Sequence, residues 1–256
     1  MHTFFCLTLT VIGIFTATTL AYANRQYAHQ ANGWYMYFGT HKVSERWSLH
    51  AEAQWRANQI IAKPQQLLLR AGINYHLSNW GMLTAGYCFV ETWPYGKQPV
   101  KVAFPEHRIW QQFQTKSASG RWEFVNRLRM EQRFVQLPIM SDSVYVPGKP
   151  VYTNRARVLN RVSISLSKKA LTDKSVYLSV YNELFINFGK NVALNIFDQN
   201  RAYVALGYVI SKIGRVEAGY MNQLLFKPDG VRVESNHTLQ VALFCTVPFY
   251  SNKSSK

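Results

Sequence analysis

The sequence predicts an all-β fold: an antiparallel transmembrane β-barrel of twelve strands, or alternatively ten, around a polar lumen rich in arginine and glutamate. Polar and apolar residues alternate along most of the chain, and a period of two is that of a strand. Most arginines share the polar parity of these runs, whereas almost every lysine lies in a turn. The runs are also longer than the roughly five to six residues of an ordinary strand. Together these features favour strands that cross a bilayer.

The chain begins with a segment that predicts export. Residues 4–20 are apolar and lead into Ala21-Tyr22-Ala23, which fits a signal peptide over residues 1–23. A membrane anchor is the alternative, although the apolar stretch is shorter than the about 20 residues of a spanning helix. We therefore expect an exported protein that is located in the outer membrane.

Eleven alternating runs follow the signal peptide. In the second run, Arg46, Glu52 and Arg56 alternate with Trp47 and Trp55. Eight of the nine prolines lie between runs or at their starts, because proline cannot donate to an internal ladder. The predicted runs are 33–41, 46–58, 65–77, 82–93, 105–116, 121–135, 152–167, 175–188, 198–210, 214–226 and 235–249.

The connections predict how the runs are oriented. Short connections follow the odd runs and longer ones follow the even runs, which is the asymmetry of outer-membrane barrels. The odd runs should then lead to the periplasm. Because bacterial single-chain barrels have an even number of strands, we expect residues 24–32 to add a cryptic strand or to thread the lumen. Residues 33–250 would form one barrel domain, and 251–256 a polar tail.

The composition of the two faces predicts which one is inside. Arginine mixed with glutamate suits a crowded ion-pair network, whereas a solvated face would also contain lysine. Aromatic residues gather at the ends of the runs, as in the girdles that lie at headgroup depth. A secreted periplasmic β-sandwich that binds a ligand is the alternative. The aromatic residues are Trp34, Trp47, Trp55, Trp80, Trp93, Tyr95, Trp122, Phe134, Phe249 and Tyr250.

The polar parity predicts an ionic cluster in the lumen, to which Glu52, Glu123 and Glu217 would also contribute. These groups either pair across the lumen and plug it, or form a basic constriction that favours anions. The expected function is therefore structural, or that of a narrow anion-preferring passage. The predicted cluster comprises Arg56, Arg70, Glu106, Arg108, Arg127, Arg129, Glu131, Arg133, Arg155, Arg157, Arg161, Glu183 and Arg201.

The formal net charge of +16 does not predict nucleic-acid binding. Its lysines are spread over many loops, so no basic patch with interleaved aromatic residues is formed. The expected partners are outer-membrane lipid and the outer-membrane insertion machinery. The sequence does not identify a soluble ligand.

No catalytic residue, cofactor or metal is predicted. His50 and His76 lie out of register on neighbouring runs, and Ser163 and Ser165 lie elsewhere, so a catalytic triad is not supported. Cys88 and Cys245 are expected to pack as small hydrophobic residues. A lipid-modifying or ligand-binding barrel enzyme with a site at the outer rim stays open as the alternative function.

Five short motifs follow one another along the chain: Pro105–Gln112 (PEHRIWQQ), Arg127–Arg133 (RLRMEQR), Tyr181–Glu183 (YNE), Phe197–Arg201 (FDQNR) and Gly219–Gln223 (GYMNQ). In order and spacing they resemble motifs of the bacterial family called domain of unknown function 2490 (DUF2490). The resemblance extends over almost the whole mature chain. It implies an exported, β-rich protein of the outer membrane, and it brings no catalytic residues with it.

Overall fold

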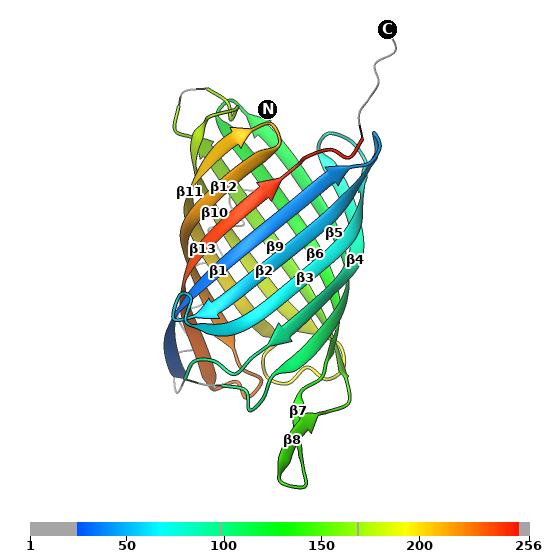
Figure 1. Ribbon diagram of the computed structural model, residues 1–256, viewed down its shortest axis with the longest axis vertical. Coiled ribbons are helices and arrows are strands. Elements are labelled where there is room, and N and C mark those ends of the chain that lie inside the picture. Colours follow the sequence, from blue (N-terminus) through cyan, green and yellow to red (C-terminus); the bar gives the residue numbers. More distant parts are fainter. Residues whose placement is uncertain (1–24, 98, 168, 251–256) are drawn as a thin grey trace.

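The computed structural model describes residues 25–97, 99–167 and 169–250. In it, each alternating run of the sequence forms one long strand (Figure 1). A short additional hairpin, β7–β8, interrupts the series. The part of the chain that the structure describes contains no helix long and apolar enough to cross a membrane. The strands are β1 Gln26–Lys42, β2 Trp47–Asn58, β3 Lys63–His76, β4 Gly81–Thr92, β5 Phe104–Ser119, β6 Trp122–Val135, β7 Pro138–Ser141, β8 Val144–Pro147, β9 Val151–Ser165, β10 Val176–Phe188, β11 Phe197–Ser211, β12 Gly214–Phe226 and β13 Arg232–Cys245.

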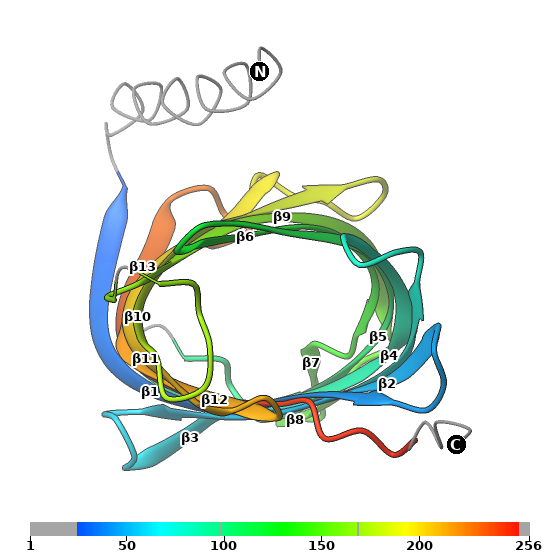
Figure 2. The same cartoon turned by 90° about the horizontal axis from the view of Figure 1, so that it is seen from above.

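The predicted barrel is confirmed, and eleven strands close it in the order β1-β13-β12-β11-β10-β9-β6-β5-β4-β3-β2 (Figure 2). The count lies between the expected twelve and the alternative ten. Because sequential neighbours are antiparallel and their number is odd, β1 and β13 run in the same direction and pair in parallel. The barrel is therefore mixed rather than fully antiparallel, and a closed barrel excludes the β-sandwich alternative.

Residues 26–32 form the first part of β1, so this segment is neither a separate strand nor a segment in the lumen. The parallel pairing with β13 begins with Gln26 opposite Arg232 and ends with Gly39 opposite Cys245. Gln30 and Asn32 face inward and are buried. Because this stretch has neither arginine nor a large apolar residue on its inner face, its alternation is weak in the sequence.

The connections define two ends of the barrel. We call the end with connections 43–46, 77–80, 120–121, 166–175 and 212–213 the turn end, and the opposite end the loop end. The loop end carries 59–62, 93–103, 136–150, 189–196 and 227–231, and the β7–β8 hairpin extends from it (Figure 1). The predicted asymmetry holds for most connections, with a longer one than expected after β9 and a shorter one after β2.

The outer face of the barrel is apolar along most of its height. Large exposed residues include Ile73, Leu128 and Leu206, while a few amides such as Asn126 and Asn160 interrupt this surface. Aromatic pairs lie at both ends of the strands. They are Trp55–Trp93, Phe134–Tyr152 and Phe197–Phe226 at the loop end, and Trp47–Tyr75 and Trp80–Phe113 at the turn end.

Two aromatic residues expected at the barrel ends lie inside instead. Trp34 is only 1% exposed and faces the lumen from the middle of β1. The phenolic O–H of Tyr95, in the loop after β4, donates to Oε2 of Glu234 over 3.0 Å. The last strand also ends earlier than expected, at Cys245, and the chain then folds back so that Phe249 stacks on His41. Pro248 cannot donate to a ladder, which explains the early end.

The parallel seam leads to a testable expectation. Phe38 lies opposite Phe244, and their rings stack with centroids 5.1 Å apart. In a chain whose native cysteines are replaced by serine, Phe38→Cys with Phe244→Cys should form a disulfide on oxidation, because paired strands lie about 4.8 Å apart. Mass spectrometry of the digested protein would detect the linked peptides.

The matched control is Phe38→Cys with Gln240→Cys, since Gln240 lies opposite Trp34 instead. Linkage in the control pair but not in the Phe38–Phe244 pair would show that the seam has a different register.

Candidate functional site

The inner face of the barrel carries the arginines and glutamates of the polar parity, because alternate residues of a strand point to the same face. Arg127, Arg133 and Arg161 are partly exposed there. The buried members of the predicted cluster are Arg56, Arg70, Glu106, Arg108, Arg129, Glu131, Arg155, Arg157, Glu183 and Arg201.

Glu131 on β6 is the centre of the largest ion-pair cluster. Its Oε2 lies 2.6 Å from Nη2 of Arg155, and its Oε1 lies 2.8 Å from Nη1 of Arg157. Arg70 and Arg108 approach the same carboxylate at 3.6 and 3.9 Å. Arg70 reaches it from three strands away, on β3, so the cluster ties separate parts of the wall together across the lumen.

Other carboxylates pair with most of the remaining lumen arginines. Several arginines bind two carboxylates at once, which the planar fork of the guanidinium allows. The further ion pairs near the loop end and the middle of the lumen are Arg127 and Arg157 with Glu183, Arg108 and Arg133 with Glu106, Arg70 with Glu52, and Arg155 with Asp198.

Asp198 faces the lumen, although the alternation of polar and apolar residues does not predict this. Nη1 of Arg155 donates to its Oδ2 over 2.8 Å. The register of β10 and β11 shifts between Phe185 and Ile186, and next to this irregularity both Asp198 and Gln199 are buried. A bulge adds one residue to a strand and so changes which parity faces inward. Strict alternation instead assigns Asp198 to the face opposite Arg201.

Buried aromatic rings fill the middle of the lumen and pack against the guanidinium groups. Cation and ring attract each other when the cation lies over the face of the ring within about 6 Å. Sequence reasoning did not identify Trp110 and Phe185 as lumen residues, since aromatic residues suit either face of a barrel. The contacts are Arg56 over Trp34 at 3.8 Å, Arg129 over Trp110 at 4.6 Å, and Arg157 and Arg201 over Phe185 at 4.4 Å each.

Two glycines on the inner face leave space for these rings. A Cβ at Gly72 would lie 3.0 Å from the ring of Trp110, and one at Gly207 would overlap the ring of Tyr177. A larger residue at either position would therefore displace the neighbouring ring.

A second ionic layer closes the turn end of the lumen. Nη1 of Arg215 on β12 lies 2.9 Å from Oε1 of Glu123 on β6, on the other side of the barrel. Glu217 is paired with Arg161 and also accepts a hydrogen bond of 2.8 Å from the O–H of Tyr177. Buried ion pairs therefore lie in the lumen near its turn end as well as in its middle.

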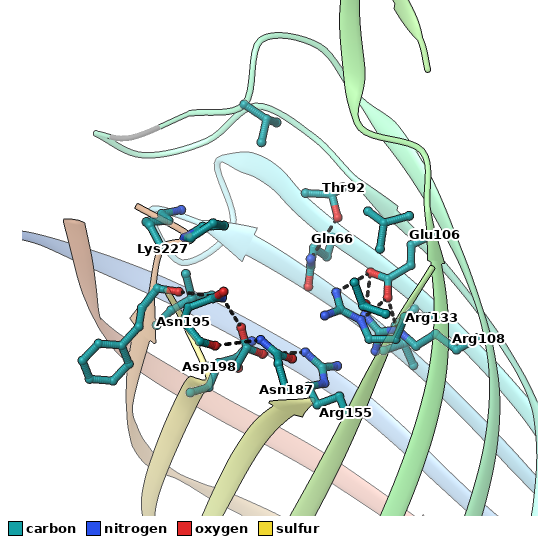
Figure 3. Close-up of a pocket in the computed structure, with 18 of the residues that line it drawn as sticks. Gln66, Thr92, Glu106, Arg108, Arg133, Arg155, Asn187, Asn195, Asp198 and Lys227 are labelled. Atoms are coloured by element: carbon teal, nitrogen blue, oxygen red, sulfur yellow. Dashed lines mark hydrogen bonds and ion pairs between the residues drawn. The ribbon is translucent and has the colours of Figure 1, made fainter. Parts of the chain in front are cut away.

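A cavity of about 400 Å³ lies above these layers, at the loop end (Figure 3). The loops before β5 and β11 contribute Val100 and Asn195 to its wall. Two lining residues are acidic, Glu106 and Asp198, so the wall is predominantly basic. The cationic lining residues are Arg56, Arg70, Arg108, Arg133, Arg155, Arg157, Arg201 and Lys227.

The histidines and serines considered for nucleophilic catalysis are held in other contacts. Ser163 and Ser165 hydrogen-bond to other serines, and His50 faces a carboxylate. Nε2 of His76 lies 2.8 Å from Oγ of Ser48, which has no exposed surface. This contact joins β2 and β3, and the register of that hairpin could have revealed it.

The cysteines and possible metal ligands offer no further site. Cys88 is buried beside Leu68, Val90 and Trp110, and both Cys88 and Cys245 are free. Over residues 25–97, 99–167 and 169–250, no three histidine, cysteine or acidic side chains are placed so that they could hold a metal ion together.

A sequence profile of the family described as "Protein of unknown function (DUF2490)" matches residues 31–234, from within β1 to the start of β13. The chain belongs to the DUF2490 family. The match covers most of the barrel, so the ionic lumen lies within the region that the chain shares with other DUF2490 proteins. No curated protein and no solved structure is significantly similar to the chain.

The Glu131 cluster leads to a prediction on stability. Glu131→Gln keeps the shape of the side chain but leaves its buried arginines without their shared counter-charge, so it should lower the free energy of unfolding by about 3–5 kcal/mol. Urea titration of the detergent-solubilised protein, followed by tryptophan fluorescence, would measure the change.

The control is Glu45→Gln in an exposed turn, which should change the free energy of unfolding by less than about 0.5 kcal/mol. If both variants unfold at the wild-type urea concentration, Glu131 does not hold the lumen together.

Proposed function

We propose that the protein spans the outer membrane of a Gram-negative bacterium and acts as a narrow, anion-preferring passage whose lumen is closed at rest. One observation carries this proposal. Ionic side chains are buried inside the barrel, while large apolar side chains are exposed outside it. A soluble barrel has the reverse arrangement, because its apolar face fills the interior.

The outer surface suits hydrocarbon better than water. Ile73, Leu128 and Leu206 have exposed fractions of 55%, 48% and 58%, and similar residues continue around the barrel. Monomeric soluble proteins rarely expose a contiguous apolar patch larger than a few hundred Å². A bilayer would cover this surface and remove the cost of its hydration.

The dimensions of the barrel support the same location. Its strands contain 12 to 17 residues, and a tilted strand needs about 9–11 to cross a bilayer. The aromatic pairs at the turn end and the loop end match the two girdles of membrane barrels. With the longer loops outside, the cavity would face the exterior and the turn end the periplasm.

The unpaired positive charge of the lumen favours anions. Arg129 is 1% exposed, donates to Oε1 of Gln112 over 2.9 and 2.7 Å, and packs on Trp110. These partners are neutral, so the charge of Arg129 is not cancelled by its nearest contacts. A charged ring in a narrow section selects ions of the opposite sign. Since buried side chains and ion pairs occupy the lumen around Arg129, passage requires the ionic layers to separate, and we expect small and infrequent conductance.

The location is tested by fractionation. The protein should be recovered in the outer-membrane fraction, and its gel migration should change on heating, because a folded barrel resists detergent until it is boiled. Immunoblotting of heated and unheated fractions would show this. Recovery as a soluble periplasmic protein would contradict the proposal.

A pair of variants tests which face contacts lipid. Leu206→Arg should cost about 2–4 kcal/mol if Leu206 lies near the middle of the bilayer. Leu194→Arg, in a loop and 76% exposed, is the control and should fold into vesicles like wild type. Equal folding of the two variants would show that the exposed strand face does not meet hydrocarbon.

The passage is tested in planar bilayers under a salt gradient. Wild type should show reversal potentials biased toward anions, and Arg129→Ala should weaken this bias because it removes a lumen charge. Lys212→Ala, in an exposed turn, should leave the bias unchanged. Bilayers that stay silent with correctly folded protein would exclude a passage.

A further inference from the structure

Arg56 in the wall of the cavity is a buried cation held by neutral groups. Its Nε and Nη2 donate to Oε1 of Gln54 over 3.0 and 2.5 Å, and its Nη1 donates to Oε1 of Gln66 over 2.7 Å. The guanidinium packs on Trp34, with its carbon 3.8 Å from the ring centroid. Arg56 is 6% exposed, so water compensates little of its charge.

Arg201 lies on the other side of the seam and packs on the same ring, 4.9 Å from its centroid. Its Nη2 donates to Oε1 of Gln199 over 3.0 Å. Its Nη1 lies 3.7 Å from Glu183, a carboxylate that Arg157 binds at 2.7 Å. Its buried Nε finds no hydrogen-bond partner among the residues that the structure describes. Arg201 therefore retains unused capacity to donate.

Positive charge exceeds negative charge in the wall of the cavity. Eight lining side chains are cationic and two are acidic, and Glu183 behind the wall is also bound by Arg127, which does not line the cavity. The contacts show where the excess lies. Arg56 has no carboxylate within ion-pair distance among the described residues, and Arg201 has only the 3.7 Å contact with the shared Glu183. The carboxylates that pair with the other lining cations are Glu52, Glu106, Glu131, Glu183, Asp198 and Glu234.

We propose that the cavity binds an oxyanion, a phosphate or sulfate group, beside Arg56 and Arg201. Buried charges need a counter-charge or strong hydration, and guanidinium groups match the geometry of oxyanions. A phosphate monoester carries about −1.5 to −2 at pH 7 and would offset part of the excess positive charge of the wall. The site deepens the proposed anion passage by naming the class of its ligand.

The cavity has room for more than the anion. Ligand pockets measure about 300–1,000 Å³, and a volume of about 400 Å³ would also hold a sugar-sized group attached to the phosphate. Asn187 lines the same wall, and its amide oxygen, which has no hydrogen-bond partner among the described residues, is suited to accept from a hydroxyl. The anion can therefore be free or part of a small organic molecule. In both cases the same arginines would bind the phosphate or sulfate group.

The test is isothermal titration calorimetry on the folded, detergent-solubilised full chain. Inorganic phosphate should bind with one site per barrel, and glucose should not bind. Glucose 1-phosphate distinguishes the sources: tighter binding than inorganic phosphate indicates a carried anion, and equal or weaker binding a free one. Absence of binding by phosphate, sulfate and glucose 1-phosphate would overturn the inference.

Variants locate the site. Arg56→Gln and Arg201→Gln should each weaken phosphate binding by about tenfold or more, because each removes charged hydrogen-bond donors. Arg215→Gln, an inward arginine near the turn end, is the matched control and should bind like wild type. Equal loss in all three variants would show a general charge effect and would overturn the site.

The melting temperature, measured with and without phosphate, is a second test that separates loss of binding from poor folding. Arg56→Gln should raise or preserve the melting temperature in phosphate-free buffer, because it relieves crowding of like charges, and should lose the increase that phosphate gives wild type. A large fall in melting temperature without phosphate would mean that Arg56 is a structural cation, contrary to the inference. Binding in detergent needs neither a membrane nor conduction, so its failure is distinguishable from failure of the proposed passage.

Discussion

The structure depends on the pairing of charges that are enclosed in a narrow barrel. Eleven strands leave a bore that side chains must fill, and taking an ion out of water costs several kcal/mol unless partners replace the water. Arginine meets this constraint because one guanidinium can serve several partners. Arg157 binds Glu131 and Glu183 and packs on Phe185 at the same time. Lysine, a compact and strongly hydrated charge, is suited to the turns where most of the lysines lie.

The odd number of strands determines which strands form the cavity wall around Trp34. A closed series of eleven strands with antiparallel sequential neighbours requires its first and last strands to be parallel. This seam fixes β1 between β13 and β2, and it turns Trp34 into the lumen. Arg56 on β2 and Arg201 on β11 then meet the same ring from two sides of the seam. The way in which the barrel closes therefore determines which residues meet in the cavity wall.

Alternation predicted the strands and the inner position of residues such as Arg108 and Glu183, because a period of two determines the face directly. It could not predict features that depend on closure or irregularity. The bulge beside Asp198 changes parity within one strand, and the first half of β1 has small or neutral inward residues that give no clear pattern. Trp110 fits a lipid girdle or a lumen equally well from sequence. Partners across the lumen, such as Arg215 with Glu123, follow only from the three-dimensional arrangement.

The distribution of charge makes a closed lumen compatible with the preference for anions that we propose. Around Glu131 each charge has a partner. This layer therefore links the strands of the wall and hinders the entry of ions. Glu183, in contrast, is shared by three arginines, Arg127, Arg157 and Arg201. An anion beside Arg201 would compete with Glu183 for the same guanidinium groups. If an anion binds as proposed, occupation of the cavity and the strength of the ion pairs of Glu183 are linked, because both depend on Arg201.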